Sequence, residues 1–80
     1  MAVRIRLARM GAKKKPFYRL VAADSEAPRD GKFLEILGTY DPMKDPAIVS
    51  VKQEKVNSWL KRGATVTESA RAILKKQGVL

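Results

Sequence analysis

Seven basic side chains fall within the first twenty residues of this chain, and no acidic side chain accompanies them. They are Arg4, Arg6, Arg9, Lys13, Lys14, Lys15 and Arg19. The formal net charge of the 80 residues is +9, so this segment supplies most of the excess. Lys and Arg side chains neutralise phosphates and release their counterions, and the gain accumulates with each contact. So basic a segment predicts a polyanionic partner, of which nucleic acid is the commonest.

A solvated, solubilising surface is the alternative interpretation of these charges. The other sixty residues hold ten basic and eight acidic side chains and are nearly neutral. Solubility does not require the basic residues to be gathered in one segment. Their segregation therefore favours a binding surface.

Aromatic side chains follow the basic ones closely. Phe17 and Tyr18 follow the triple lysine after one proline, and Tyr40 precedes an Asp-Pro pair. Such rings can stack on unpaired bases of RNA. For each ring a place in the core is the stronger expectation, with the tyrosine hydroxyls at its rim. A basic turn at residues 29–32 could add a guanidinium and backbone N–H groups facing a phosphate.

Enzymatic chemistry has little support in this composition. The chain has no His and no Cys, which removes the usual general base at neutral pH and the thiolate nucleophile. Asp24, Glu26 and Asp30 could hold Mg²⁺ beside a phosphodiester, as in metal-dependent nucleases. Acidic residues in a short, turn-rich loop are more often turn formers, and we favour that interpretation. We expect neither an enzyme nor a bound cofactor.

Length and apolar content indicate one small domain over residues 1–80. Hydrophobic residues make up 45% of the chain, which is too many for a disordered basic tail. The longest apolar run covers only residues 20–23, far short of the ~20 residues that a bilayer span needs. No signal peptide is visible, because the start alternates basic and apolar residues. We therefore expect no membrane partner.

The basic residues are positioned by a pattern typical of strands. Residues 2–8 alternate, with Val3, Ile5 and Leu7 on one side and Arg4 and Arg6 on the other. The two guanidiniums should therefore project from the face opposite the core. A basic loop is predicted over residues 10–16. The next strand, about 17–23, is apolar on both faces, which indicates a central strand whose second face is partly covered.

Further elements follow from turn residues and a change of period. Strands are predicted over about 33–40 and 47–51, separated by a proline-rich crossing. A helix then starts near Gln53, or at a capping box from Ser50, and ends at Gly63. Its apolar stripe is Val56, Trp59 and Leu60.

A last helix, about 67–77, starts at Thr67 or at a box from Thr65 to Glu68 and ends at Gly78. It should bury Ala70, Ile73 and Leu74. The expected fold is α+β: a small mixed, largely antiparallel sheet of about four strands, with two helices packed on one face.

Taken together, these residues closely resemble the bacterial small-subunit ribosomal protein sixteen family. The resemblance is carried by Val-Arg-Ile-Arg-Leu-Ala-Arg-Met-Gly at 3–11, Lys-Lys-Lys-Pro-Phe-Tyr-Arg-Leu-Val-Ala-Ala-Asp at 13–24, Pro-Arg-Asp-Gly at 28–31, Leu-Gly-Thr-Tyr-Asp-Pro at 37–42, Trp59-Leu60, Gly63-Ala64 and Thr67-Glu68. It covers nearly the whole chain in order. One departure is Lys52, where many members have Asp, and it weakens the expected side-chain cap of the first helix.

The resemblance implies a structural, non-enzymatic constituent of the small ribosomal subunit. Such a protein binds the small-subunit (16S) ribosomal RNA, lies beside other small-subunit proteins, and supports subunit assembly and translation. It would work in the ribosome of a bacterial cytoplasm or of an organelle of bacterial descent, without forming a homo-oligomer. Carried over by position, the RNA-binding residues are Arg4, Arg6, Arg9, Gly11, Lys13, Lys14, Lys15, Tyr18, Arg19, Arg29, Asp30, Gly31, Lys32 and Tyr40.

We expect the basic face of the sheet and the loops at 10–15 and 29–32 to clamp RNA phosphates. Two other functions stay open from the residues alone. A Mg²⁺-dependent nuclease would use the loop carboxylates. A non-specific binder of nucleic acid or anionic membrane would accept any polyanion with equal affinity.

Overall fold

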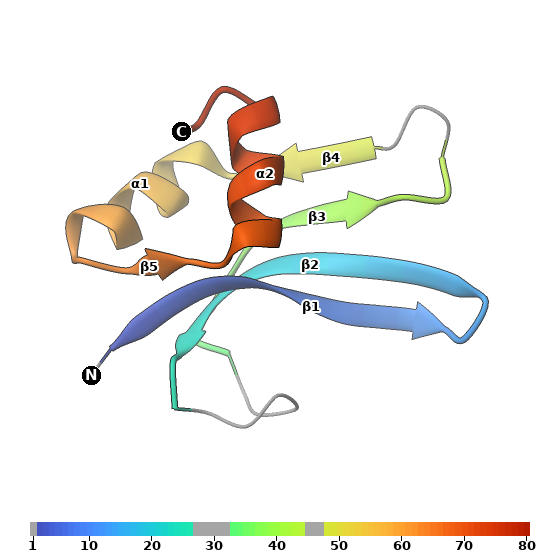
Figure 1. The fold of residues 1–80 in the computed structure, drawn as a ribbon, viewed down its shortest axis with the longest axis horizontal. Helices are drawn as coiled ribbons and strands as arrows, with labels where there is room; N and C mark the ends of the chain where they lie inside the picture. Colours follow the sequence, from blue (N-terminus) through green and yellow to red (C-terminus); the bar gives the residue numbers. More distant parts are fainter. Residues whose placement is uncertain (1, 27–32, 45–47) are drawn as a thin grey trace.

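A five-stranded sheet with helices on one face makes up the described part of the chain in this computed structural model, residues 2–26, 33–44 and 48–80 (Figure 1). The elements, in order, are β1 (Val3–Ala12), β2 (Lys15–Asp24), β3 (Glu35–Asp41), β4 (Ile48–Val51), α1 (Gln53–Lys61), β5 (Thr65–Val66) and α2 (Glu68–Lys76). The strand order is β4-β3-β2-β1-β5. All neighbours are antiparallel except β1 and β5, which are parallel. The predicted α+β class is confirmed, with one strand more than expected.

β1 and β2 form a long hairpin that closes tightly. Their pairing continues to Ala12 opposite Lys15, so only Lys13 and Lys14 lie in the turn. The predicted loop over 10–16 is therefore wrong. Gly11 makes the extension possible because its φ is +86°, a backbone conformation that side chains with a Cβ rarely adopt. A Cβ on Gly11 would also lie only 2.6 Å from the Lys15 carbonyl oxygen.

The pairing of β2 with β3 contains a bulge. Leu20 pairs with Gly38, whereas Val21 pairs with Ile36, so Leu37 is the extra residue of β3. Bulges bend a strand and redirect its side chains. Here the extra side chain is fully buried in the core.

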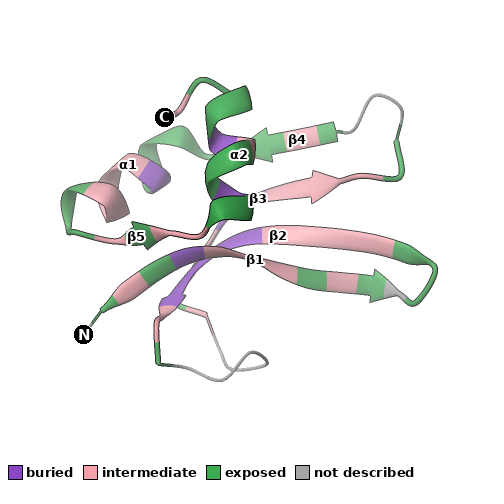
Figure 2. Ribbon diagram, in the orientation of Figure 1, coloured by how far each residue is buried: buried purple, intermediate pink, exposed green. Residues whose placement is uncertain are grey.

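The core lies between the sheet and the two described helices. The sheet contributes the buried side chains of Ile5, Leu20, Ala22 and Leu37, and the helices contribute those of Val56, Ala70 and Leu74. Figure 2 shows these buried positions gathered where the helices cross the sheet. The sheet face packed on the helices is called the inner face below, and the opposite one the outer face.

Most of the predicted apolar stripes are confirmed. Trp59 and Leu60 pack against the core without being fully buried, and Ile73 is half-buried outside the buried cluster. On the outer face, Val21 and Ala23 are buried but do not belong to that cluster. This agrees with a central strand whose second face is partly covered.

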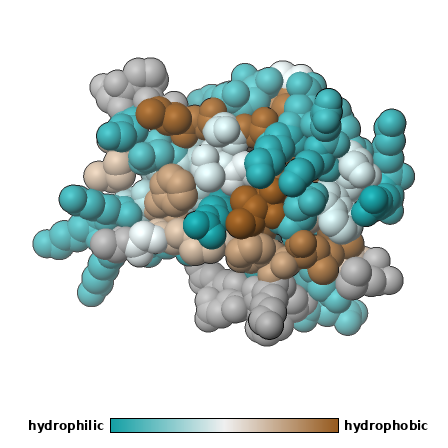
Figure 3. All heavy atoms as spheres, turned by 180° about the vertical axis from the view of Figure 1, so that it is seen from behind, coloured by the Kyte–Doolittle hydropathy of each residue, from teal (hydrophilic) through white to brown (hydrophobic). Residues whose placement is uncertain are grey.

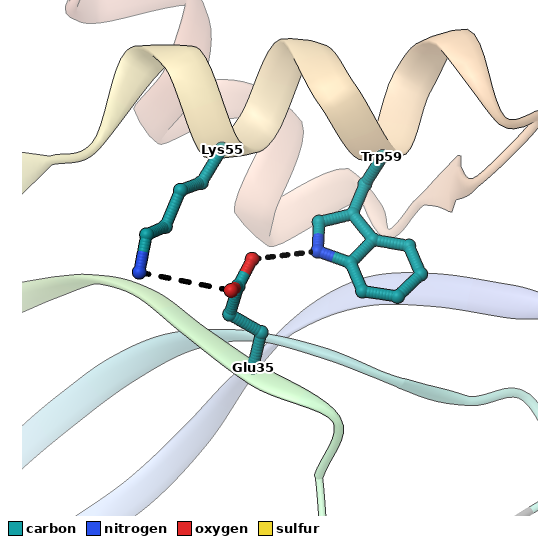
Figure 4. Close-up of polar contacts among 3 residues, drawn as sticks. All are labelled: Glu35, Lys55 and Trp59. Atoms are coloured by element: carbon teal, nitrogen blue, oxygen red, sulfur yellow. Dashed lines mark hydrogen bonds and ion pairs between the residues drawn. The ribbon is translucent and has the colours of Figure 1, made fainter.

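Glu35 fastens α1 to β3 at the edge of the core. The Trp59 indole N–H donates to its Oε1 at 2.9 Å, and the Lys55 ammonium lies 3.6 Å from its Oε2 (Figure 4). The Arg62 guanidinium lies over the Trp59 ring, 5.0 Å from its centroid. Trp59 was predicted in the apolar stripe of the helix; it packs against the core, and its polar N–H lies at the boundary, where a carboxylate accepts its hydrogen bond.

The helix ends match part of the sequence pattern. Thr67 Oγ1 accepts a hydrogen bond from the Ala70 N–H at 3.3 Å, so the predicted Thr67 cap is confirmed. Lys52 precedes α1 with no side-chain cap hydrogen bond among the described residues. The alternative box from Ser50 does not form, because Ser50 lies in β4. Gly63 follows α1 with a positive φ of 88°, as predicted.

β5 is the element that the sequence did not indicate. Thr65 and Val66 pair in parallel with Arg4 and Ile5, and the Thr67 N–H donates to the Ile5 carbonyl at 3.1 Å. Two residues are too few for a period to be recognised. This short strand nevertheless joins the start of α2 to β1.

Candidate nucleic-acid interface

Three arginines lie on the outer face of the sheet. Side chains alternate along β1, so Arg4 and Arg6 point away from Ile5, which is buried in the core. Arg19 of β2 is opposite Ala8 and therefore lies on the same face. The sequence prediction that Arg4 and Arg6 face away from the core is confirmed, and Arg19 joins them.

The outer arginines are close neighbours because the sheet sets their spacing. Arg4 and Arg6 are two residues apart on one strand, about 7 Å along it. Arg19 is diagonal to Arg6 across the β1–β2 pair, a separation of about 7–8 Å. The view from behind shows strongly hydrophilic side chains interleaved with apolar ones (Figure 3). Arg4 is exposed, whereas Arg6 and Arg19 are half-buried, as expected for stems that lie along the sheet.

The triple lysine forms the tip of the hairpin. Lys13, Lys14 and Lys15 are all exposed. The Arg9 guanidinium donates from Nη2 to the Lys13 carbonyl oxygen at 3.0 Å and so supports the turn. We call residues 9–18 the arm, because this part of the hairpin projects beyond α2 (Figure 1). Its tip brings three ammonium groups together on a tight turn.

Arg9 does not join the outer arginines. It is four residues from Ile5 and pairs with Tyr18, which is two residues from the buried Leu20, so both point to the inner face. The basic segment is thus divided between two faces and a tip. The two-residue spacing of Arg9 from Leu7 was the signal that could have indicated this division, but the predicted strand ended at residue 8 and left Arg9 out.

The aromatic residues lie outside the buried core cluster. Tyr18 and Tyr40 are half-buried on the inner face, with ring centroids 6.0 Å apart and ring planes inclined by 30°. Phe17 is half-buried on the outer face, opposite Met10. The expected core placement is wrong for Phe17, because β2 has apolar residues on both faces and Phe17 lies on the face away from α1 and α2. Tyr18 and Tyr40 lie on the inner face but beyond the core, whose last residue on β2 is Leu20.

The loop acids behave as turn formers where the structure describes them. Asp24 Oδ1 accepts a hydrogen bond from the Glu26 N–H at 3.0 Å. Within residues 2–26, 33–44 and 48–80, no group of three or more acidic side chains is placed to hold a metal ion. Asp30 and its neighbours Arg29, Gly31 and Lys32 lie outside the described residues. No described helix is long and apolar enough to cross a membrane.

Comparisons with known proteins agree with the sequence pattern. The family model described as ribosomal protein S16 matches residues 9–67. A protein of Desulforapulum autotrophicum, named small ribosomal subunit protein bS16, is 63% identical over 78 residues, covering 98% of this chain and 93% of that protein. A protein of the same name from Carboxydothermus hydrogenoformans is 58% identical over 80 residues, covering 100% of this chain and 93% of the relative. The similarity therefore includes the arm, the outer arginines and the helices.

Proposed function

Because this chain belongs to the ribosomal protein S16 family, we propose that its outer face and arm bind the RNA of the small ribosomal subunit directly. The chain is a structural, non-enzymatic constituent of that subunit and takes part in translation.

One observation carries the proposal: the outer arginines project from rigid paired strands on the face opposite α1 and α2. Arg4, Arg6 and Arg19 are held by continuous β1–β2 pairing, so the positions of their stems are set before any RNA arrives. Preorganised donors lose less conformational entropy on binding than flexible ones. Guanidiniums also match phosphate oxygens with two parallel hydrogen bonds.

The tip of the arm extends the same surface. Three exposed ammonium groups, two in the turn and one at the start of β2, can reach a second stretch of backbone phosphates. The proposed contacts also include Gly11, whose missing side chain lets RNA approach the backbone, and residues 29–32, which lie outside the described part. Because the major groove of A-form RNA is deep and narrow, these contacts recognise backbone geometry and 2′-hydroxyls rather than base edges.

The setting follows from the family. We propose that the chain lies beside other small-subunit proteins and supports folding of the RNA during assembly, in the bacterial cytoplasm or in an organelle of bacterial descent. A homo-oligomer or a membrane contact is not part of this function. The relatives from Desulforapulum autotrophicum and Carboxydothermus hydrogenoformans are named as proteins of the small ribosomal subunit.

The test is a titration of the purified chain against small-subunit ribosomal RNA and an unrelated structured RNA of equal length, over a salt series. We expect the ribosomal RNA to bind more tightly by orders of magnitude at physiological salt. Equal affinities that fall in parallel with salt would mean that the surface binds any polyanion.

Charge reversal then locates the surface. Arg4→Glu with Arg6→Glu should abolish most of the preference and block incorporation into small subunits, because like charge then faces phosphate from a rigid strand. The matched control is Arg71→Glu with Lys75→Glu, which changes the net charge equally on the exposed side of α2. If both double variants bind and incorporate alike, the outer face is not the RNA surface.

A further inference from the structure

A row of four side chains crosses the inner face of the sheet just beyond the core. Arg9 pairs with Tyr18, Tyr18 with Tyr40, and Tyr40 with Val49, so strands β1 to β4 each contribute one residue. We propose that this tyrosine row (Arg9, Tyr18, Tyr40 and Val49) holds one unpaired RNA nucleotide, with its base on the rings and a phosphate on the guanidinium. The proposal rests on the proposed function, since it names the RNA element that the arm recognises.

The row lies where the cover of the helices ends. The next row inward is Leu7, Leu20, Gly38 and Val51, and its three apolar side chains form or border the core. The start of α2 is joined to β1 at Ile5. Arg9 is four residues further along β1, about 13 Å away. Figure 2 shows the same boundary, as β2 changes from buried to intermediate towards the turn. The rings are therefore ordered by the sheet without being sealed by a helix.

The two rings form one prearranged aromatic surface. Their centroids are 6.0 Å apart with planes inclined by 30°, within the range of favourable aromatic pairs. Each ring restricts the other, so little side-chain entropy remains to be lost on binding. Every base has a π-face, which makes such a surface tolerant of sequence. Paired bases are enclosed within a duplex, so the rings can reach only an unpaired nucleotide.

Arg9 supplies the charge that a nucleotide needs beside the rings. Its side chain is exposed, and its Nη2 donates to the Lys13 carbonyl at 3.0 Å, which holds the guanidinium towards the tip. An arginine has five N–H donors, so this bond leaves others for a phosphate. Gly11, two residues further on, adds no side chain on this side of the arm. A phosphate can therefore approach the guanidinium from the tip while its base lies over the rings.

The first measurement uses the unaltered chain bound to bacterial small-subunit ribosomal RNA. Reagents that modify bases, and hydroxyl radicals that cleave the backbone, are applied with and without the protein. We expect at least one unpaired base to be protected, together with backbone at neighbouring phosphates. If the protein protects backbone but no unpaired base, the tyrosine row does not hold a nucleotide.

The second measurement separates rings from charge. The variant Tyr18→Ile/Tyr40→Ile keeps apolar, strand-favouring side chains, and the matched control Tyr18→Phe/Tyr40→Phe keeps the rings. The isoleucine variant should bind roughly ten-fold more weakly or worse, whereas the phenylalanine variant should stay within about two-fold of the parent. The slope of log affinity against log salt should be equal in all three proteins, because stacking releases no counterions.

The two levels of the proposal fail in different ways. If the parent chain does not prefer ribosomal RNA, or if the Arg4→Glu/Arg6→Glu variant binds normally, the proposed function fails. If the preference stands but the isoleucine variant binds like the parent, only the tyrosine row fails. Thermal unfolding of each variant shows whether it is folded at the assay temperature. If the isoleucine variant is unfolded there, the tyrosine row is tested by base protection instead. Both the parent and the phenylalanine variant must then protect an unpaired base, and failure of either to do so contradicts the tyrosine row.

Discussion

The β1–β2 hairpin has two halves with opposite uses. In the half near the chain's start, Ile5, Leu20 and Ala22 are buried beneath the helices. In the arm, Arg9 and the three tip lysines are exposed, although the backbone pairing is equally continuous. The strands are longer than the layer of helices that covers them. One pair of strands therefore builds the core and also carries a binding surface away from it.

This division separates stability from binding. The free energy of folding comes mainly from apolar surface removed from water, which is concentrated in the covered half. The arm buries little and depends on pairing that the covered half anchors, because a two-stranded hairpin alone is only marginally stable. Substitutions in the covered half should therefore change mainly the free energy of unfolding, and substitutions in the arm mainly the binding of RNA.

The largest effect is expected in the covered half. Leu74→Ala removes a fully buried side chain of α2 from the core and should lower the free energy of unfolding by about 2–5 kcal/mol. The matched control is Ile73→Ala, because Ile73 is half-buried and outside the buried cluster. Denaturant unfolding measures both. If Ile73→Ala lowers the free energy of unfolding as much as Leu74→Ala does, the core is not where we describe it. If the folded Leu74→Ala protein binds RNA with a changed salt slope, stability and binding are not separated between the two halves.

A smaller effect, on binding alone, is expected at the tip. Replacing Lys13, Lys14 and Lys15 with Ala should reduce the salt slope of RNA binding by about 2, since each phosphate contact contributes about 0.7–0.9. The unfolding free energy should stay within about 0.5 kcal/mol of the parent, as for most exposed positions. Alanine at Lys61, Lys75 and Lys76, on the helices, is the charge-matched control. An equal fall of the slope in both variants would show that total charge, and not the arm, determines binding.

The smallest effect is a gain of stability. Lys52 precedes α1 without a side-chain cap hydrogen bond among the described residues, although its place suits an acceptor. Lys52→Asp should raise the free energy of unfolding by about 0.5–1 kcal/mol, because a carboxylate accepts from the first free N–H groups and complements the helix dipole. Lys52→Ala distinguishes capping from simple loss of the positive charge. If the alanine variant gains as much stability, the cap is not the cause.

Several parts of the fold could be predicted from local pattern. The alternation of Val3, Ile5 and Leu7 with arginine identified the first strand and its core face, because side-chain direction has a period of two. Gly63 indicated the end of α1, and Thr67 the start of α2, because these ends need a positive φ and a side-chain acceptor respectively. The family resemblance, carried by residues along nearly the whole chain, also pointed to the ribosome.

Other parts were decided by contacts between distant segments. The tight turn at Lys13-Lys14, the strand at Thr65–Val66 and the bulge at Leu37 all depend on which strands become neighbours and in which register. No local period carries that information, because one residue of slip reverses every side chain.

By itself, the sequence determined the composition of the binding surface: a basic segment, its strand period and the aromatic residues beside it. Only the tertiary structure decided that Arg19 joins Arg4 and Arg6 on the outer face, and that Arg9, Tyr18 and Tyr40 form one row on the inner one. The physical reason is that charge and hydropathy belong to single residues, whereas a row across four strands exists only after backbone hydrogen bonds have set the register between them.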